Sequence, residues 1–214
     1  MTKYKFTYSM IKNIIQNIST LVVIGKWNIH VFSPEWVKDN LFEDEDMNVS
    51  VALPTGPYQF KGKTFELTVS DSRLHIELLT DEDSARIDAI VALRTTLRLL
   101  GQTPVSAFGI NFCYETDADL NSYIRNINQT LEAQYTKVKC DIKWALFDDN
   151  RNSTNIVLRR NSGSNTFRID VNFNYPIDEC LQIMTMIGDD AIITSRERDC
   201  EQLLKEMFNI ETDK

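Results

Sequence analysis

Residues 64–79, which read TFELTVSDSRLHIELL, carry the pattern that decides the fold. Apolar and polar side chains alternate on both sides of a short polar turn at residues 70–72, and the apolar positions are Phe65, Leu67, Val69, Leu74, Ile76 and Leu78. Successive side chains of a strand point to opposite faces, so this alternation places the apolar residues on one face. Two such segments around a turn predict an antiparallel hairpin with one dry and one hydrated face.

A helix is expected to follow the hairpin and to cover its dry face. From Thr80 or Asp81 onward, apolar residues recur at helical spacing, and Gly101 and Pro104 end the segment. The expected apolar stripe consists of Ile87, Ile90, Leu93, Leu97 and Leu100, with Arg86, Arg94 and Arg98 outside it. An antiparallel sheet can keep one face wet when helices cover the other face.

Upstream of the hairpin, the sequence predicts a leading helix, a strand, a short helix and a further strand. Residues 9–18 place apolar side chains at helical spacing, whereas residues 20–32 are rich in β-branched and aromatic residues, which favour a strand. Ser33 and Pro34 mark the start of the short helix, because serine caps free amide groups and proline at the first position loses no hydrogen bond. The further strand is expected at residues 49–53.

The second half of the chain repeats this order of elements. After a strand at 105–115, the sequence predicts a helix at 117–135, strands at 138–147, 155–160 and 166–175, and a C-terminal helical region with a break near Gly188. The expected class is therefore α+β, with two similar β-α-β-β-β-α halves in residues 1–102 and 103–214. Together the halves are expected to pack as one unit, a curved and mainly antiparallel sheet backed by helices on one face.

This order of elements is similar to that of duplicated, saddle-shaped proteins of the TATA-binding type and, more loosely, to helix-grip domains. The resemblance concerns architecture, with no shared motif, and it implies a continuous curved sheet. The formal net charge of −8 departs from what a groove-binding saddle needs. Nucleic-acid binding draws much of its free energy from lysine and arginine replacing counterions, so nucleic acid is not an expected partner.

Composition favours a cytoplasmic protein with reduced thiols. Hydrophobic residues make up 43% and charged residues 25% of the chain, close to ordinary globular domains. We find no run of about 18 apolar residues that would span a bilayer, and polar residues interrupt the N-terminal segment too often for a secretion signal. The four cysteines form no C-x-x-C pair, in a chain of 214 residues that is large enough to fold without disulfides.

The sequence contains no motif of a cofactor-dependent enzyme. G-x-S-x-G, Walker-type, G-x-G-x-x-G and H-E-x-x-H patterns are all missing, so no cofactor is expected. Histidine is scarce as well, because His30 and His75 are the only two. His75 lies near Glu66 and Glu77 in the predicted hairpin, and this set could hold a metal ion or move a proton. A half-exposed strand histidine without a ligand accounts for the same pattern.

Asp141 and Lys143 resemble the D-x-K element of a nuclease superfamily, in which a carboxylate holds magnesium and a lysine polarises the attacked phosphate. Asp170, on another predicted strand, would supply a further carboxylate. The element lies in the wrong strand for that superfamily, and a match of three residues is common by chance. The three residues are therefore weak catalytic candidates.

The hydrated face of the second half is the main candidate for a binding surface. Its expected members are polar residues on neighbouring strands: Lys139, Asp141, Lys143, Arg159, Arg160, Arg168, Asp170 and Asn172. Such groups can form a docking surface, and they can also pair with one another without any ligand.

The leading hypothesis is a non-catalytic subunit that binds another protein, including a second copy of itself, through sheet edges or the polar face. Residues 151–169 carry four arginines and no acid, which favours an acidic partner surface. One alternative is a metal-dependent phosphodiesterase or nuclease that uses Asp141, Lys143 and Asp170. Another is a helix-grip domain that binds a small apolar ligand between the helix at residues 87–100 and the sheet. A membrane is not an expected partner.

Overall fold

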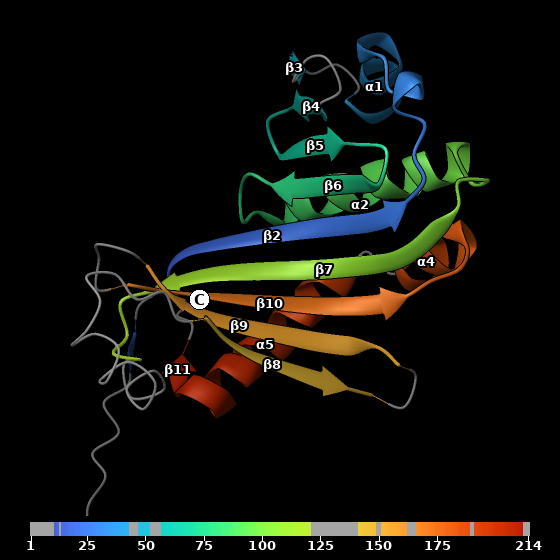
Figure 1. Cartoon of the computed structure of the whole chain (residues 1–214). Coiled ribbons are helices and arrows are strands. Elements are labelled where there is room, and N and C mark those ends of the chain that lie inside the picture. The colour runs from blue at the N-terminus through green and yellow to red at the C-terminus, as the bar shows by residue number, and fades with distance from the viewer. Residues whose placement is uncertain are drawn as a thin grey trace, which may run out of the picture.

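The protein has an α+β fold built on one curved, open, mainly antiparallel sheet (Figure 1). The computed structural model describes residues 11–12, 14–42, 47–51, 57–120, 141–148, 151–161, 166–188 and 191–211. The nine strands of the sheet are β2 (Ile14–Gly25), β3 (Asn48–Val51), β4 (Tyr58–Lys61), β5 (Phe65–Val69), β6 (Arg73–Leu78), β7 (Val105–Thr116), β8 (Asp141–Phe147), β9 (Ser153–Arg160) and β10 (Phe167–Pro176). The described helices are α1 (Pro34–Leu41), α2 (Asp83–Leu99), α4 (Cys180–Met186) and α5 (Ile192–Phe208).

The strands lie in the order β3-β4-β5-β6-β2-β7-β10-β9-β8. The two long central strands, β2 and β7, pair antiparallel and join the earlier part of the chain to the later part. A separate pair of short parallel strands, β1 (Ile11–Lys12) and β11 (Ile210–Glu211), links the two ends of the described chain. The edges of the large sheet are therefore β3 and β8.

Helices α2 and α5 lie behind the same face of the sheet (Figure 1). In β5, β6 and β10, every second residue points into this layer and is buried. The fully buried large side chains there include Phe60, Leu67, Ile76, Phe108, Phe112 and Phe167. The opposite face, here called the open face, carries the alternate, mostly polar side chains.

The structure confirms the predicted hairpin, formed by β5 and β6, and the helix that follows it, α2. Strands β5 and β6 pair antiparallel around the turn at residues 70–72, with Leu67 opposite Ile76. Ser33 caps α1 by accepting a hydrogen bond from the Trp36 amide at 3.2 Å. The break near Gly188 is also confirmed, since it separates α4 from α5.

The predicted leading helix at residues 9–18 is wrong, because residues 14–25 form strand β2. A short apolar run fits a helix and a strand equally well, and pairing with β7 along its length decides for the strand. The strand also ends earlier than predicted. At Gly25 an added Cβ would lie 2.7 Å from the Pro104 carbonyl oxygen, and the chain then turns through a 3-10 helix at Ile29–Val31.

The predicted inner face of α2 needs correction at two positions. The helical spacing predicts that Ile87 faces the sheet, but its side chain is 47% exposed. It also predicts that Arg86 lies outside the apolar stripe, but Arg86 is buried. Ile90, Leu93 and Leu97 are buried as predicted, and the small residues Ala85, Ala89 and Ala92 are buried beside them. Small side chains let the helix approach the sheet closely.

Other predictions differ in extent or lie outside the described chain. Strands β4 and β11, which are only four and two residues long, were not predicted from the sequence. The helix expected at 117–135 falls almost entirely at residues 121–140, which are outside the described ranges, and residues 117–120 are not helical. Within the described ranges, we find no helix long and apolar enough to cross a membrane.

Candidate binding surfaces

Arginine and aspartate side chains pair on the open face of β8, β9 and β10. Register places Asp141 opposite Arg159, and Arg159 opposite Arg168. The Arg159 guanidinium contacts Asp170 and also lies 3.4 Å from the Asp141 carboxylate. Asp170 additionally accepts a hydrogen bond from Arg168 Nε at 2.7 Å. The carboxylates that the D-x-K pattern singled out thus have arginine as their nearest charge, which reduces their ability to attract a metal cation.

A chain of amide side chains continues this face towards the centre of the sheet. Asn155 donates a hydrogen bond to Asn172 at 3.3 Å, Asn172 donates to Asn111, and Asn111 donates to Thr20 at 2.9 Å. These residues, here called the amide ladder, come from β9, β10, β7 and β2. Of these residues only Asn172 could be predicted from the sequence, because the others align with it only once the strand register is known.

The other predicted members of this surface are distributed unevenly. Lys143 is exposed on the open face, opposite Val157 of β9. Arg160 is exposed but pairs in register with Phe167, which is buried under the helices, so it belongs to the opposite face. Lys139 lies outside the described ranges.

The open face of the earlier strands carries His75 and two glutamates. Glu66 lies directly opposite Glu77, and His75 lies opposite Thr68. Glu66 also accepts a hydrogen bond from Gln59. Burial lowers the pKa of His75, although Glu77 and Glu66 act in the opposite direction. Among the described residues, we find no group of three or more His, Cys, Asp or Glu that could hold a metal ion.

Cys113 lies on the open face beside the charged network. It is opposite Asp170 in the register of β7 and β10. Burial, and after it the negative charge of Asp170, raises the pKa of the Cys113 thiol to about 11. The thiol is therefore protonated at neutral pH and is a poor nucleophile.

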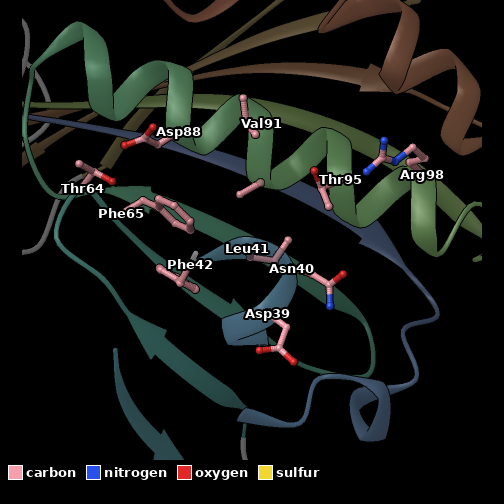
Figure 2. Close-up of a pocket in the computed structure, with 11 residues that line it drawn as sticks. Asp39, Asn40, Leu41, Phe42, Thr64, Phe65, Asp88, Val91, Thr95 and Arg98 are labelled. Carbon is pink, nitrogen blue, oxygen red and sulfur yellow. The ribbon is translucent and has the colours of Figure 1, made fainter. Parts of the chain in front are cut away.

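A cleft of 330 Å³ lies between α1, α2 and the start of β5. Figure 2 shows Asp88 and Thr64 towards one end and Arg98 at the other, with Asp39 and Asn40 on the α1 side. At its base the rings of Phe42 and Phe65 stack with centroids 4.5 Å apart. The cleft is beside α2, whereas the side of α2 that faces the sheet is fully packed at Ile90 and Leu93.

The solvent side of α2 carries large apolar residues. Ile87, Val91 and Leu99 are 47%, 47% and 46% exposed. Between them lie Asp88, Thr95 and Arg98, which also line the cleft. This set of six residues is here called the α2 stripe. The stripe was not predicted from the sequence, because the helical spacing places Ile87 on the side that faces the sheet.

Edge strand β8 ends in two further exposed apolar residues, Leu146 at 46% and Phe147 at 75%. They border a cavity of 190 Å³ that reaches Arg196 on α5. The Arg196 guanidinium lies over the rings of Phe173 and Tyr175, at 5.4 and 5.7 Å from their centroids. Stacking on two rings holds this cation in place.

Helices α2 and α5 are joined by a buried ion pair. Arg86 Nη2 lies 3.1 Å from Glu197 Oε2, and the two side chains are 8% and 2% exposed. Arg86 also contacts the carboxylates of Asp83, at 2.9 Å, and Asp81. The pair connects residues 111 positions apart and has a structural role, since neither side chain reaches the open face.

No known protein-family model matches the chain, and no curated protein sequence matches it.

Proposed function

We propose that the protein is a non-catalytic assembly subunit that binds a second copy of itself. The observation that carries this proposal is the location of the large exposed apolar residues. In the described ranges these are Val49, Ile87, Val91, Leu99, Leu146, Phe147 and Leu181. Three lie on α2 and two on edge strand β8, so most of them concentrate on two elements. Concentrated exposed apolar groups are typical of protein interfaces.

The open face supports a non-catalytic role. Asp141 and Asp170 contact arginine, and the members of the amide ladder bond to one another. Polar groups that are satisfied within the protein rigidify the sheet and do not require a substrate. For this reason we do not extend the nuclease hypothesis, which would need these carboxylates to hold magnesium.

The order of the strands supports an internal duplication as part of the proposal. Moving outward from β2, the sheet continues through β6, β5, β4 and β3, and moving outward from β7 it continues through β10, β9 and β8. In both directions the strands appear in reverse order of the chain. A saddle-like frame of two similar halves would expose a regular open face and leave two edges for association.

A second candidate function is the binding of a small molecule in the cleft beside α2. Its volume of 330 Å³ is at the lower end of ligand pockets. The cleft presents Asp39, Asp88 and Arg98, so a ligand with a charged group fits it better than the purely apolar ligand of the helix-grip hypothesis. Native mass spectrometry of the purified protein tests this function, and a chain mass without any bound compound counts against it.

Light scattering coupled to size-exclusion chromatography tests the assembly function. The expected result is a concentration-dependent shift from the 24.7 kDa chain mass towards twice that mass. A mass that stays at the monomer value up to about millimolar concentration, where even weak association is visible, would contradict the proposal. Lysine substitutions of the exposed apolar residues on α2 and β8 should weaken association, and Leu181→Lys is the matched control, because Leu181 is 66% exposed on α4.

A further inference from the structure

We propose that the cavity between strands β8–β10 and helix α5 binds a small apolar α-amino acid, with the ligand carboxylate at Arg196 and the ligand ammonium group at Asp148. The cavity has a volume of 190 Å³. At about 30 Å³ per water molecule in the liquid, a ligand of about six to ten non-hydrogen atoms fits this space, which is the size of one amino acid. The inference goes beyond the assembly function, which can hold or fail independently of it.

Two buried polar atoms in the wall of this cavity have no hydrogen-bond partner in the part of the chain that the structure describes. They are the Tyr175 hydroxyl and Nε of Arg196. Tyr175 is only 6% exposed, and burial is the main cause that raises its pKa, so its hydroxyl is protonated at neutral pH and can donate. Buried polar groups are nearly always paired, so two unpaired donors in one cavity wall indicate a ligand that accepts hydrogen bonds.

The Arg196 guanidinium has one nitrogen in an ion pair and one edge that is unpaired. Nη1 lies 2.7 Å from the Asp199 carboxylate, whereas Nε and Nη2 have no hydrogen-bond partner among the described residues. Nε and Nη2 form the edge of a guanidinium that binds a carboxylate through two parallel hydrogen bonds. A carboxylate on this edge could also accept a hydrogen bond from the Tyr175 hydroxyl.

Binding requires a small movement of the Arg196 guanidinium, because both unpaired atoms are buried. The Arg196 side chain is 36% exposed and lies over the rings of Phe173 and Tyr175, at 5.4 and 5.7 Å from their centroids. Stacking of a cation on a ring is weak at a partly exposed site. A paired carboxylate makes stronger, charge-assisted hydrogen bonds, so the exchange favours the ligand.

The negative charge of Asp148 selects a ligand that also carries a cation. Asp148 lines the same cavity, and its oxygens accept two hydrogen bonds from Asn152. A carboxylate has about four acceptor positions, so it can also accept from an ammonium group. Asp148 repels a ligand that has only a carboxylate, whereas the ammonium group of an amino acid turns this repulsion into attraction.

The remaining wall suits an apolar side chain. Leu146 and Phe147, at the end of β8, are 46% and 75% exposed, and Phe173 is buried at 5%. A ligand side chain placed against these three residues removes apolar surface from water on both partners. Charged groups for recognition and an apolar wall for the side chain thus meet in one cavity.

Isothermal titration calorimetry with L-leucine, L-valine and L-methionine tests the proposal. At least one of them should bind one-to-one with a Kd of about 1 mM or lower, and no saturable binding by any of them up to about 20 mM would overturn the proposal. Two analogues of leucine test the two charges. 4-Methylpentanoate lacks the ammonium group and 3-methylbutylamine lacks the carboxylate, so each should bind at least about tenfold more weakly than leucine. An analogue that binds as tightly as leucine contradicts the role of the charge that it lacks.

Two conservative variants test the location. Arg196→Lys keeps the charge but loses the two-pronged edge and should weaken binding at least about tenfold. Tyr175→Phe removes only the hydroxyl and should weaken binding about fivefold without lowering the melting temperature, because this hydroxyl has no partner within the described protein. Arg198→Lys, at an exposed position of α5, is the control and should bind as the wild type does. Wild-type affinity in both Arg196→Lys and Tyr175→Phe would show that the amino acid binds elsewhere.

Discussion

At the scale of single residues, Arg86 shows how the buried side of a helix can include a charge. Its guanidinium lies between Asp81, Asp83 and Glu197, and only the last of these is buried as deeply as Arg86. A buried cation needs nearby carboxylates, since transfer out of water is costly for an unpaired charge. Glu197 is 111 positions away, so spacing along the chain could not identify it.

Glu197→Ala is expected to destabilise the fold by about 3 kcal/mol, near the lower end for breaking a buried ion pair, because Asp81 and Asp83 remain beside Arg86. Urea unfolding followed by circular dichroism measures the change. Arg198→Ala on the exposed side of α5 is the control and should change stability by less than about 0.5 kcal/mol. A loss for Glu197→Ala no larger than that of the control would mean that the pair does not stabilise the protein.

His75 should make the protein less stable in mild acid. Its pKa is lowered from the ordinary value of 6.5, mainly by burial, so the folded state binds fewer protons than the unfolded state below that pH. The free energy of unfolding should therefore fall as the pH drops through 6.5 towards the folded-state pKa, and be unaffected well above 6.5.

The variant His75→Gln should lose less stability than the wild type between about pH 7 and pH 5, because glutamine does not titrate. Thermal melts across this range measure the difference, and His30→Gln, at an exposed position after β2, should follow the wild type. Identical pH profiles for His75→Gln and the wild type would show that the histidine is not linked to folding.

At the scale of elements, register places side chains that no local pattern connects. The amide ladder joins four strands, and its contact between Asn111 and Thr20 spans 91 positions. Gly109 lies next to the ladder on β7, where an added Cβ would come 3.1 Å from Nδ2 of Asn172. That distance is shorter than an ordinary van der Waals contact, so the amide would have to move.

Gly109→Ala is expected to cost about 1 kcal/mol, because displacing Asn172 weakens its hydrogen bonds to Asn111 and Asn155. A double-mutant cycle with Asn172→Ala tests the cause. In the Asn172→Ala background the obstructing amide is gone, so Gly109→Ala should cost less than in the wild type. Strictly additive losses would mean that the ladder is not what limits the space at Gly109.

At the scale of the whole molecule, the central pair β2–β7 and the helix contacts join the two halves. Arg94 of α2 donates a hydrogen bond to the Ile187 carbonyl oxygen at 2.7 Å, in addition to the Arg86–Glu197 pair. The sheet runs without interruption across the boundary that the sequence predicted between residues 102 and 103. The halves therefore share one core layer.

Unfolding should be a single cooperative transition, because neither half keeps its central neighbour when the other unfolds. The tryptophans report on the two halves separately, since Trp27 and Trp36 lie before the boundary and Trp144 after it. Replacing Trp144 with Phe, or Trp27 and Trp36 together, leaves a probe in one half only. The urea curves from fluorescence and from far-ultraviolet circular dichroism should coincide within each variant, and separated midpoints would show that the halves unfold independently.

Alternation and capping were enough to predict the β5–β6 hairpin, the start of α1 at Ser33 and the α+β class, because these follow from patterns between residues that are close together in the chain. Strand periodicity also placed Asp141, Arg168 and Asp170 on one face, but it did not distinguish Arg159 from Arg160, which lies on the opposite face. The mutual pairing of these side chains was not predicted, nor were the strand at residues 14–25, the burial of Arg86 and the exposed α2 stripe. Each of these depends on which distant segment packs alongside, since pairing and burial between segments about a hundred positions apart outweigh a weak local preference.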